Sequence, residues 1–259
     1  MRRLLGASAL AAALAAAAPV PAVAAQEGAA APRPPDVREV ARRQDDLYTS
    51  AASVARVEMT TVTPRRSRTL RMRMWSRGRT KALILIEAPA RDAGTATLRI
   101  ERNLWNYLPR ISRTIRVPPS MMLSRWMGSD VTNDDLTRSS SWVDDFEGRV
   151  VGRTRNGRGW LVRYDARRGT VGLWRRVETV VDDALLPIRS RFFDRRGRLA
   201  RTMEFRDVRE MGGRRIPTRI VITPNDRPGH RTELRYLEID FDADMPESTF
   251  SLSQLERRR

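Results

Sequence analysis

The pattern of apolar and polar positions divides the chain into a short helical part and a long part built of strands. From Asp36, a residue suited to capping a helix, apolar side chains recur at helical spacing up to Tyr48 and predict one amphipathic helix. After about Ser53 the pattern changes to a period of two, which is typical of half-buried strands. Residues 25–35, before the helix, are rich in Ala, Pro and Gly, so we expect a flexible lead there.

The segments with a period of two are separated by turn residues. Met72 and Met74 alternate with arginines in one such segment, and similar segments continue as far as 233–241. Turns such as Gly212-Gly213 lie between them, and strands joined by tight turns run antiparallel. The sequence therefore predicts a mainly β (α+β) fold, an antiparallel meander of about eleven strands preceded by one helix.

The stretch from Ser120 to Asp145 lacks this alternation and interrupts the strands. It is rich in Met and Trp, and short helices fit it best, with Asn133 or Asp134 capping one of them. A meander of this size curls under its own twist and has one face to cover. If the helices pack tightly on that face, the result is an ordinary core. If they form a lid over a curved half-barrel, a hydrophobic cavity remains between helices and sheet.

The first residues have the three parts of an export signal. Two arginines supply positive charge, an uncharged run of mostly Ala and Leu follows, and Ala22-Val23-Ala24 offers the small residues that a signal peptidase requires. We therefore expect a cleaved signal peptide over residues 1–24. The alternative is a retained membrane anchor, but a spanning helix needs about 20 apolar residues, and this run is shorter.

The absence of cysteine adds to the picture of an exported protein. Without cysteine the chain forms no disulfide, and it lacks the residue to which a lipid anchor is attached. Together with the export signal, this favours an unanchored protein of the bacterial periplasm, and we expect a monomer. The main domain is expected over residues 36–255, followed by a basic tail over 256–259.

The chain is strongly basic, with a formal net charge of +18 that becomes +16 once the two arginines of the signal are removed. A basic protein usually indicates nucleic acid or an anionic membrane as its partner. Export argues against nucleic acid, and Lys81 is the only lysine, a bias that codon usage explains. Because the arginines alternate with apolar residues, we interpret them as the solvated face of the sheet. An anionic membrane surface stays open as a partner.

The sequence offers little to a catalytic or metal site. His230 is the only histidine and no G-x-S-x-G motif accompanies it, so neither a Ser-His-Asp triad nor a multi-histidine zinc site is expected. The acidic residues between Asp130 and Asp145 lack the Gly and Glu positions of a calcium-binding EF-hand loop. We therefore expect a protein that is not an enzyme, with no metal and no cofactor.

Several short motifs occur in an order that resembles a known family. They are L-W-N-Y-L-P at 104–109, W-M-G-S-D at 126–130, D-D-L at 134–136 and R-R-I-P-T at 214–218. In this order they resemble the outer membrane lipoprotein-sorting proteins of the LolA-like superfamily. Val131 stands where the family usually has an aromatic residue, which is a small departure.

The resemblance implies an incomplete, strongly curved antiparallel barrel with a helical lid around a hydrophobic cavity. It also implies that the protein carries a lipid, or the acyl chains of a lipoprotein, between membranes. Unbranched Met fills irregular space and suits such a cavity, whereas aromatic residues either line it or fill a core. The candidate cavity and lid residues are Met72, Met74, Trp105, Tyr107, Met121, Met122, Trp126, Met127 and Trp142.

Two other functions stay open at this point. Some members of the family accompany lipid exporters of the RND type, so the protein could dock such an inner-membrane exporter without carrying cargo. A third interpretation is a structural envelope protein that its arginine-rich surface holds at membranes. The sequence names neither the cargo nor its donor and acceptor.

Overall fold

The computed structural model describes residues 33–137, 142–170 and 172–257. The expected signal peptide, residues 1–24, and most of the expected lead, residues 25–35, lie outside the described residues. One compact unit spans Pro34–Arg259, and every element named below belongs to it.

Helix α1, Val37–Asp46, is the first element of this unit. The carboxylate of Asp36 accepts a hydrogen bond from the backbone N–H of Arg38 at 2.9 Å and caps the first turn. The predicted helix and its capping residue are therefore confirmed. Its buried residues include Val40 and Ala41, which face the sheet because apolar residues at helical spacing share one side.

Thirteen strands follow, and all of them belong to one antiparallel sheet. Their bounds are β1 Ala52–Thr63, β2 Arg66–Arg77, β3 Lys81–Ala88, β4 Ala96–Ile100, β5 Asn103–Leu108, β6 Arg113–Arg116, β7 Phe146–Arg153, β8 Trp160–Ala166, β9 Trp174–Val181, β10 Pro187–Asp194, β11 Leu199–Met211, β12 Arg214–Pro224 and β13 Arg231–Asp240. The predicted class, mainly β with a few helices, is confirmed. The count is thirteen instead of about eleven, because short segments such as β4 and β6 are full members of the sheet.

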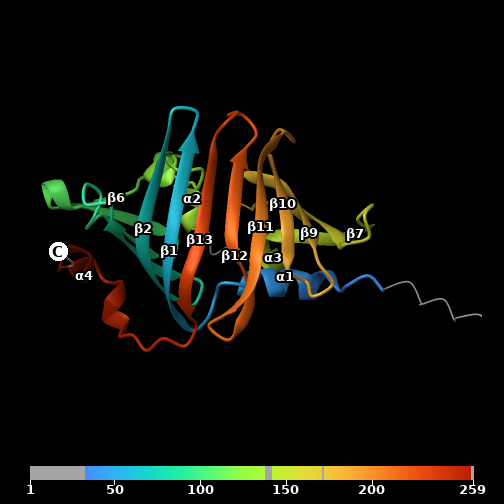
Figure 1. The fold of residues 1–259 in the computed structure, drawn as a ribbon, viewed down its shortest axis with the longest axis horizontal. Coiled ribbons are helices and arrows are strands. Elements are labelled where there is room, and N and C mark those ends of the chain that lie inside the picture. Colours follow the sequence, from blue (N-terminus) through green and yellow to red (C-terminus); the bar gives the residue numbers. More distant parts are fainter. Residues whose placement is uncertain (1–32, 138–141, 171, 258–259) are drawn as a thin grey trace, which may run out of the picture. The chain divides into compact units, whose positions relative to one another are not determined.

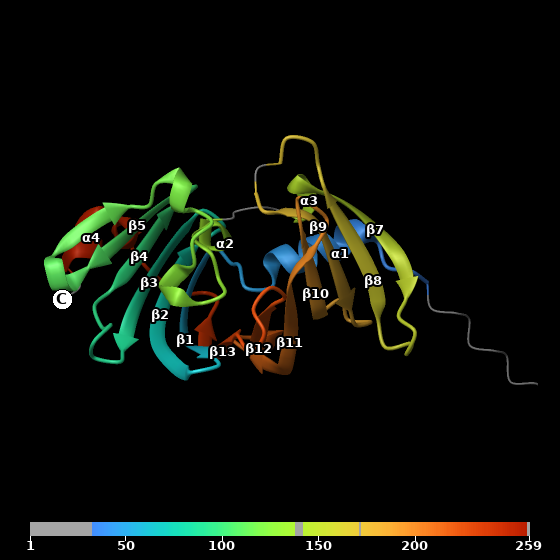
Figure 2. The same cartoon turned by 90° about the horizontal axis from the view of Figure 1, so that it is seen from above.

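The strand order shows how the chain is arranged in the sheet. The order is β6-β5-β4-β3-β2-β1-β13-β12-β11-β10-β9-β8-β7, so the first and last strands pair in the middle (Figure 1). Ala55 lies opposite Ile239 in this central pair. The two edges, β6 and β7, are neighbours in the sequence. The connection between them, residues 117–145 and called the insertion below, therefore crosses from one edge of the curved sheet to the other (Figure 2).

The insertion contains four short helical segments, as predicted. They are η2 Pro119–Met121, η3 Trp126–Gly128, α2 Asn133–Thr137 and α3 Trp142–Asp145. The residue that caps α2 is Thr132, one position before the two candidates Asn133 and Asp134. Its hydroxyl accepts a hydrogen bond from the Asp135 backbone N–H at 3.1 Å, and the Asp135 carboxylate accepts one from the Thr132 N–H at 2.9 Å. This reciprocal pair is a capping box.

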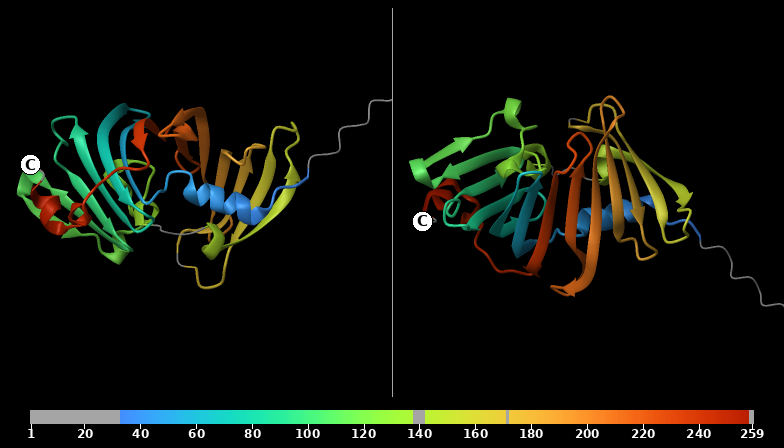
Figure 3. Two further views of the ribbon diagram at one scale, coloured as in Figure 1. Left: turned by 90° about the horizontal axis from the view of Figure 1, so that it is seen from below. Right: turned by 45° about the horizontal axis from the view of Figure 1, so that its top comes forward.

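Different elements cover the two faces of the sheet. Helices α1, α2 and α3 lie on the concave face, whereas η4 (Glu247–Phe250) and α4 (Leu252–Arg257) lie outside, against the opposite face of β3–β5 (Figures 2 and 3). Glu256 and Arg257, expected in a tail, belong to α4. Phe250 and Leu255 are buried there. Strand β4 is consequently covered on both sides, and Ala96 to Arg99 are all buried.

Candidate functional site

One half of the concave face is filled by side chains. This half, called the α1 half, consists of β7–β11 with α1 and α3 against them. Tyr164 and Val162 are fully buried in its cluster. The indole of Trp142 packs against the rings of Tyr164 and Phe146, at centroid distances of 4.9 and 5.4 Å. Tilted aromatic contacts of this kind stabilise a core.

The other half, called the insertion half, consists of β1–β5 with η3 and α2 above them. Cross-strand pairing arranges its inward side chains in rows across the strands. One row contains Ser53, Ser76, Ala82, Arg99 and Leu104. The next row contains Ala55, Met74, Ile84, Thr97 and Asn106, and the row after it Val57, Met72 and Ile86. The face thus changes from a partly polar row at one strand end to apolar rows further in.

A pocket of about 350 Å³ lies over the first two rows, where the end of α1 and helix α2 meet the sheet. Its lining combines apolar side chains with polar ones. The apolar residues are Tyr48, Met74, Ile84, Leu104, Leu136, Trp142 and Tyr236. The polar residues include Asp45, Ser76, Arg79, Thr97, Arg99 and Asp135. Such a lining fits a molecule that has one polar and one apolar end.

Polar contacts fasten the start of the insertion to three distant strands. The indole N–H of Trp126 donates to the hydroxyl of Thr97 on β4 at 3.0 Å, inside the structure. Asp130 accepts a hydrogen bond from the hydroxyl of Thr232 on β13 at 2.8 Å and forms an ion pair with Arg227. The W-M-G-S-D motif therefore anchors the insertion, because its Trp and Asp reach the floor of the sheet.

A buried ion pair makes the third attachment. The Arg201 guanidinium on β11 donates two hydrogen bonds to the Asp135 carboxylate, at 2.6 and 2.8 Å. The same guanidinium lies 4.5 Å from the ring centroid of Trp174. Burial acts to raise the pKa of Asp135, but the charge and hydrogen bonds of Arg201 and the bonds from Thr132 outweigh it and lower the pKa. Asp135 therefore stays ionised.

The end of α1 contributes a second ion pair and an aromatic stack. Asp45 pairs with Arg79 of the β2–β3 turn at 2.7 Å and also accepts the backbone N–H of Trp142 at 2.9 Å. The rings of Tyr48 and Tyr236 stack with centroids 4.9 Å apart. Burial raises the pKa of Tyr236 to about 12 and that of Tyr48 further, so both hydroxyls are neutral at pH 7.

The structure separates the predicted cavity residues into distinct groups. Met74 and Trp142 line the pocket. Met72 and Trp126 are buried on the same face, and Met127 packs against them. The remaining four are elsewhere: Trp105 and Tyr107 lie on the outer face with the C-terminal segment, Met121 is exposed and Met122 is half-buried in the insertion.

Sequence reasoning missed the charged residues inside the concave face. The interpretation of the arginines as a solvated face holds for Arg71, whose side chain is 67% exposed. It is wrong for Arg99 and Arg201, which are buried. The period of two placed Arg99 with Thr97 on one face correctly, but it carried no signal that helices cover this face.

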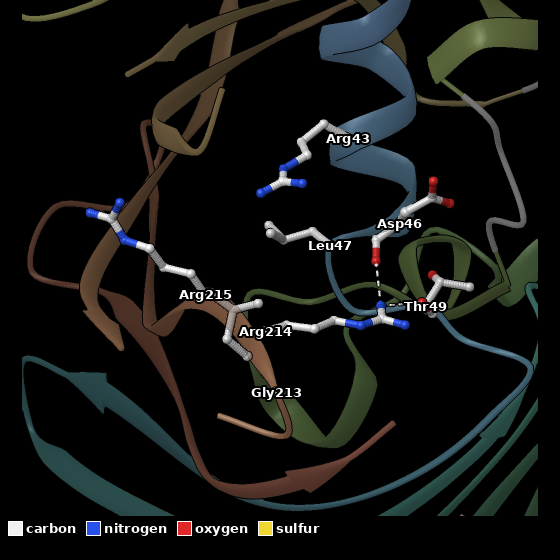
Figure 4. A pocket seen from close by; sticks show the side chains of 8 residues that line it. Arg43, Asp46, Leu47, Thr49, Gly213, Arg214 and Arg215 are labelled. Atoms are coloured by element: carbon white, nitrogen blue, oxygen red, sulfur yellow. Dashed lines mark hydrogen bonds between the residues drawn. The ribbon is translucent and has the colours of Figure 1, made fainter. Parts of the chain in front are cut away.

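A second, more open pocket lies beside the end of α1 and the β11–β12 turn (Figure 4). The Arg214 guanidinium donates hydrogen bonds to the backbone carbonyls of Asp46 and Thr49, at 3.1 and 2.7 Å, so it connects β12 to α1. Arg43 and Arg215 also line this pocket and give its rim positive charge. This pocket has few apolar residues, which makes it a poor site for an acyl chain.

Two further observations concern metals and membranes. Within residues 33–137, 142–170 and 172–257, no group of three or more His or acidic side chains is placed to hold a metal ion. In the same part of the chain, no helix is long and apolar enough to cross a membrane.

Three solved structures share this arrangement of sheet, insertion and helices. A DUF1329 family protein from Desulfovibrio piger matches with a TM-score of 0.76 and 22% identity, over 84% of this chain and 96% of the other. A putative outer membrane lipoprotein-sorting protein domain from Vibrio parahaemolyticus gives 0.73 and 23%, over 85% and 97%. A LolA superfamily protein from Nitrosomonas europaea gives 0.71 and 21%, over 84% and 98%. The fold is therefore LolA-like.

A family model with the description "Uncharacterized protein" matches residues 78–257. This match spans more than half of the chain, so the chain belongs to that family. A sequence search of curated proteins finds no match.

Proposed function

We propose that this protein is a periplasmic carrier that holds a lipid, or the acyl chains of a lipoprotein, on the concave face of its sheet. The observation that supports this most is the pocket between α1, α2 and strands β2–β4, with an apolar end at Met74 and Ile84 and a polar end at Ser76 and Arg99. The fold is the one found in a lipoprotein-sorting domain. The predicted export signal would bring the protein to the compartment where such carriers work.

The energetics of acyl burial agree with a carrier that opens and closes. Each methylene removed from water contributes about 0.8 kcal/mol, so a 16-carbon chain contributes roughly 12 kcal/mol when fully buried. The present pocket of about 350 Å³ lies near the lower limit for small-molecule sites. A whole diacyl lipid therefore requires the insertion to move away from the sheet. Release then follows from exchanging polar attachments with water, without a covalent step.

A pocket-filling variant tests the proposal. Ala82 lines the pocket between Ser76 and Arg99, so Ala82→Trp places an indole in the space meant for cargo. The matched control is Ala51→Trp, because Ala51 is exposed just before β1. Lipids extracted from the purified protein are identified by mass spectrometry, and binding of a fluorescent fatty acid is titrated.

Wild type and Ala51→Trp are expected to retain extractable lipid and to bind the fluorescent fatty acid. Ala82→Trp is expected to lose at least about tenfold in affinity, because the indole occupies the volume of several methylenes. Wild-type protein that is repeatedly free of lipid and does not bind the fatty acid contradicts the proposal.

A further inference from the structure

Arg99 is a buried cation without a partner in the pocket described above. Only 9% of its surface is exposed, and its Nε is fully buried without a hydrogen-bond acceptor. Throughout the described part of the chain, Arg99 has no hydrogen bond and no ion pair. Burial without compensation lowers the pKa of this arginine, but a guanidinium still keeps its proton at neutral pH.

Comparison with the other buried arginines shows how unusual this is. Five arginines in the described residues have a buried Nε that lacks a hydrogen-bond partner. Four of them form an ion pair through another nitrogen, and these pairs are Arg68–Asp92, Arg77–Glu247, Arg201–Asp135 and Arg227–Asp130. Arg99 is the fifth and has no such carboxylate. A buried charge that nothing balances is strongly unfavourable, so the fold retains a cost at this one position.

The acidic residues of the pocket do not balance Arg99. The pocket is lined by two carboxylates, Asp45 and Asp135. The first pairs with Arg79 at 2.7 Å, and the second receives both hydrogen bonds of Arg201. Once these pairs are formed, the described lining has one uncompensated positive charge, at Arg99.

The cross-strand rows give this charge a position relative to the apolar surface. Arg99 lies opposite Ala82 and Leu104, in the row nearest the β2–β3 turn. The next row inward contains Met74 and Ile84. A ligand in the pocket thus meets a cation at one end and aliphatic side chains at the other.

We propose that Arg99 binds the anionic head group of an acyl amphiphile, a carboxylate or a phosphate, whose chain extends over Met74 and Ile84. This inference rests on the proposed carrier function and defines its cargo class more narrowly. A planar guanidinium donates two parallel hydrogen bonds to either anion, and such charge-assisted bonds are strong where water is excluded. The ligand would supply the counter-charge that the protein lacks.

The test compares probes that differ only in the head group. Oleate and oleoyl lysophosphatidic acid have the two anionic head groups, and oleyl alcohol has the same chain without charge. Acetate and inorganic phosphate supply the anions without a chain. Affinities are measured by calorimetry for the wild type, Arg99→Met and Arg99→Lys. Arg71→Met is the control, because it removes an exposed arginine from the outer face of β2.

We expect the wild type to prefer the anionic lipids over oleyl alcohol by about tenfold to a hundredfold, the usual effect of hydrogen bonds to a charged group. Arg99→Met should abolish this preference while keeping affinity for oleyl alcohol, and Arg99→Lys should restore part of it. Arg71→Met should behave as wild type. Which of the two anionic lipids binds more tightly identifies the head group, and acetate and phosphate should bind weakly.

Protein without ligand gives a second readout. Arg99→Met replaces an unbalanced buried charge with an aliphatic side chain, so its midpoint of unfolding in urea should equal or exceed that of the wild type. Arg71→Met should not raise it.

Three results would overturn the inference. One is equal affinity of the wild type for oleate and oleyl alcohol, another is an unchanged preference in Arg99→Met, and the third is tight binding of phosphate or acetate alone. In the first two cases the carrier function survives, because a lipid still binds. Absence of binding to all three lipids would contradict the carrier function itself.

Discussion

The two halves of the concave face use the same curved sheet for different purposes. In the α1 half, the rings of Trp142, Phe146 and Tyr164 pack against one another and leave a closed core. In the insertion half, the corresponding positions hold smaller or flexible side chains such as Ala82 and Met74, and a pocket of about 350 Å³ remains. Whether a sheet forms a core or a binding space thus depends on side-chain volume and on the element that covers it.

The difference extends to charge. The buried arginine next to the filled half, Arg201, is held by Asp135 and by aromatic rings. Arg99, under the insertion, has no counter-charge in the described residues. A protein interior normally pairs every buried charge, so the half with the unbalanced arginine is the half suited to a ligand. The predictions below test this contrast, beginning with the largest expected effect.

Truncating Tyr164 should damage the filled half and leave the pocket intact. Its ring is fully buried, and its hydroxyl accepts a hydrogen bond from the Gln44 side chain at 3.3 Å. Tyr164→Ala should lower the free energy of unfolding by roughly 3–5 kcal/mol, as for other large aromatic truncations. Urea unfolding measures the loss. Lipid affinity of the folded fraction should stay near that of the wild type, and a parallel loss of binding would show that the halves are not independent.

Removing the charge of Asp135 should weaken the attachment between the halves. Asp135→Asn leaves the Arg201 guanidinium buried without a counter-charge, which should lower the free energy of unfolding by about 3 kcal/mol at pH 7. The control is the double variant Asp135→Leu with Arg201→Met, which removes both charges and should recover much of the loss. If the double variant is less stable than Asp135→Asn, the pair is not the cause.

The same pair predicts a dependence on pH. Because Arg201 lowers the pKa of Asp135 in the folded state, its contribution is complete above the unfolded pKa, about 4, and is lost as the pH falls through the folded value. The stability difference between wild type and Asp135→Asn should therefore be constant from pH 7 to about pH 5 and shrink below pH 4. Urea unfolding at each pH measures it, and a difference that grows on acidification would contradict the assignment.

Two methionines of one strand should respond differently to truncation. Met72 is 2% exposed in the core, so Met72→Ala should cost roughly 2–4 kcal/mol. Met74 is half-buried and lines the pocket, so Met74→Ala should cost only about 1 kcal/mol. The effect on lipid affinity should be the reverse, with the larger loss for Met74→Ala. Equal costs for the two variants would mean that Met74 fills a core instead of lining a pocket.

Local pattern determined most of the secondary structure. The helix after Asp36, the antiparallel strands and the short helices of the insertion could all be predicted, because capping and side-chain periodicity act between residues close in sequence. The pairing of β1 with β13 could not, since a period of two shows that a segment is a strand and not which distant strand lies beside it. The crossing of the insertion from β6 to β7 follows from that pairing.

Only the tertiary structure decided which face each residue serves. Trp105 and Tyr107 have the composition of cavity residues, yet the C-terminal segment covers them on the outer face. Thr97 and Arg99 alternate with Ala96 and Leu98, and the pattern alone would place them in water. They are buried because both faces of β4 are covered, by elements that come from the middle and the end of the chain. The sequence determined that Arg99 is charged, and long-range packing determined that its charge is enclosed beside an apolar surface.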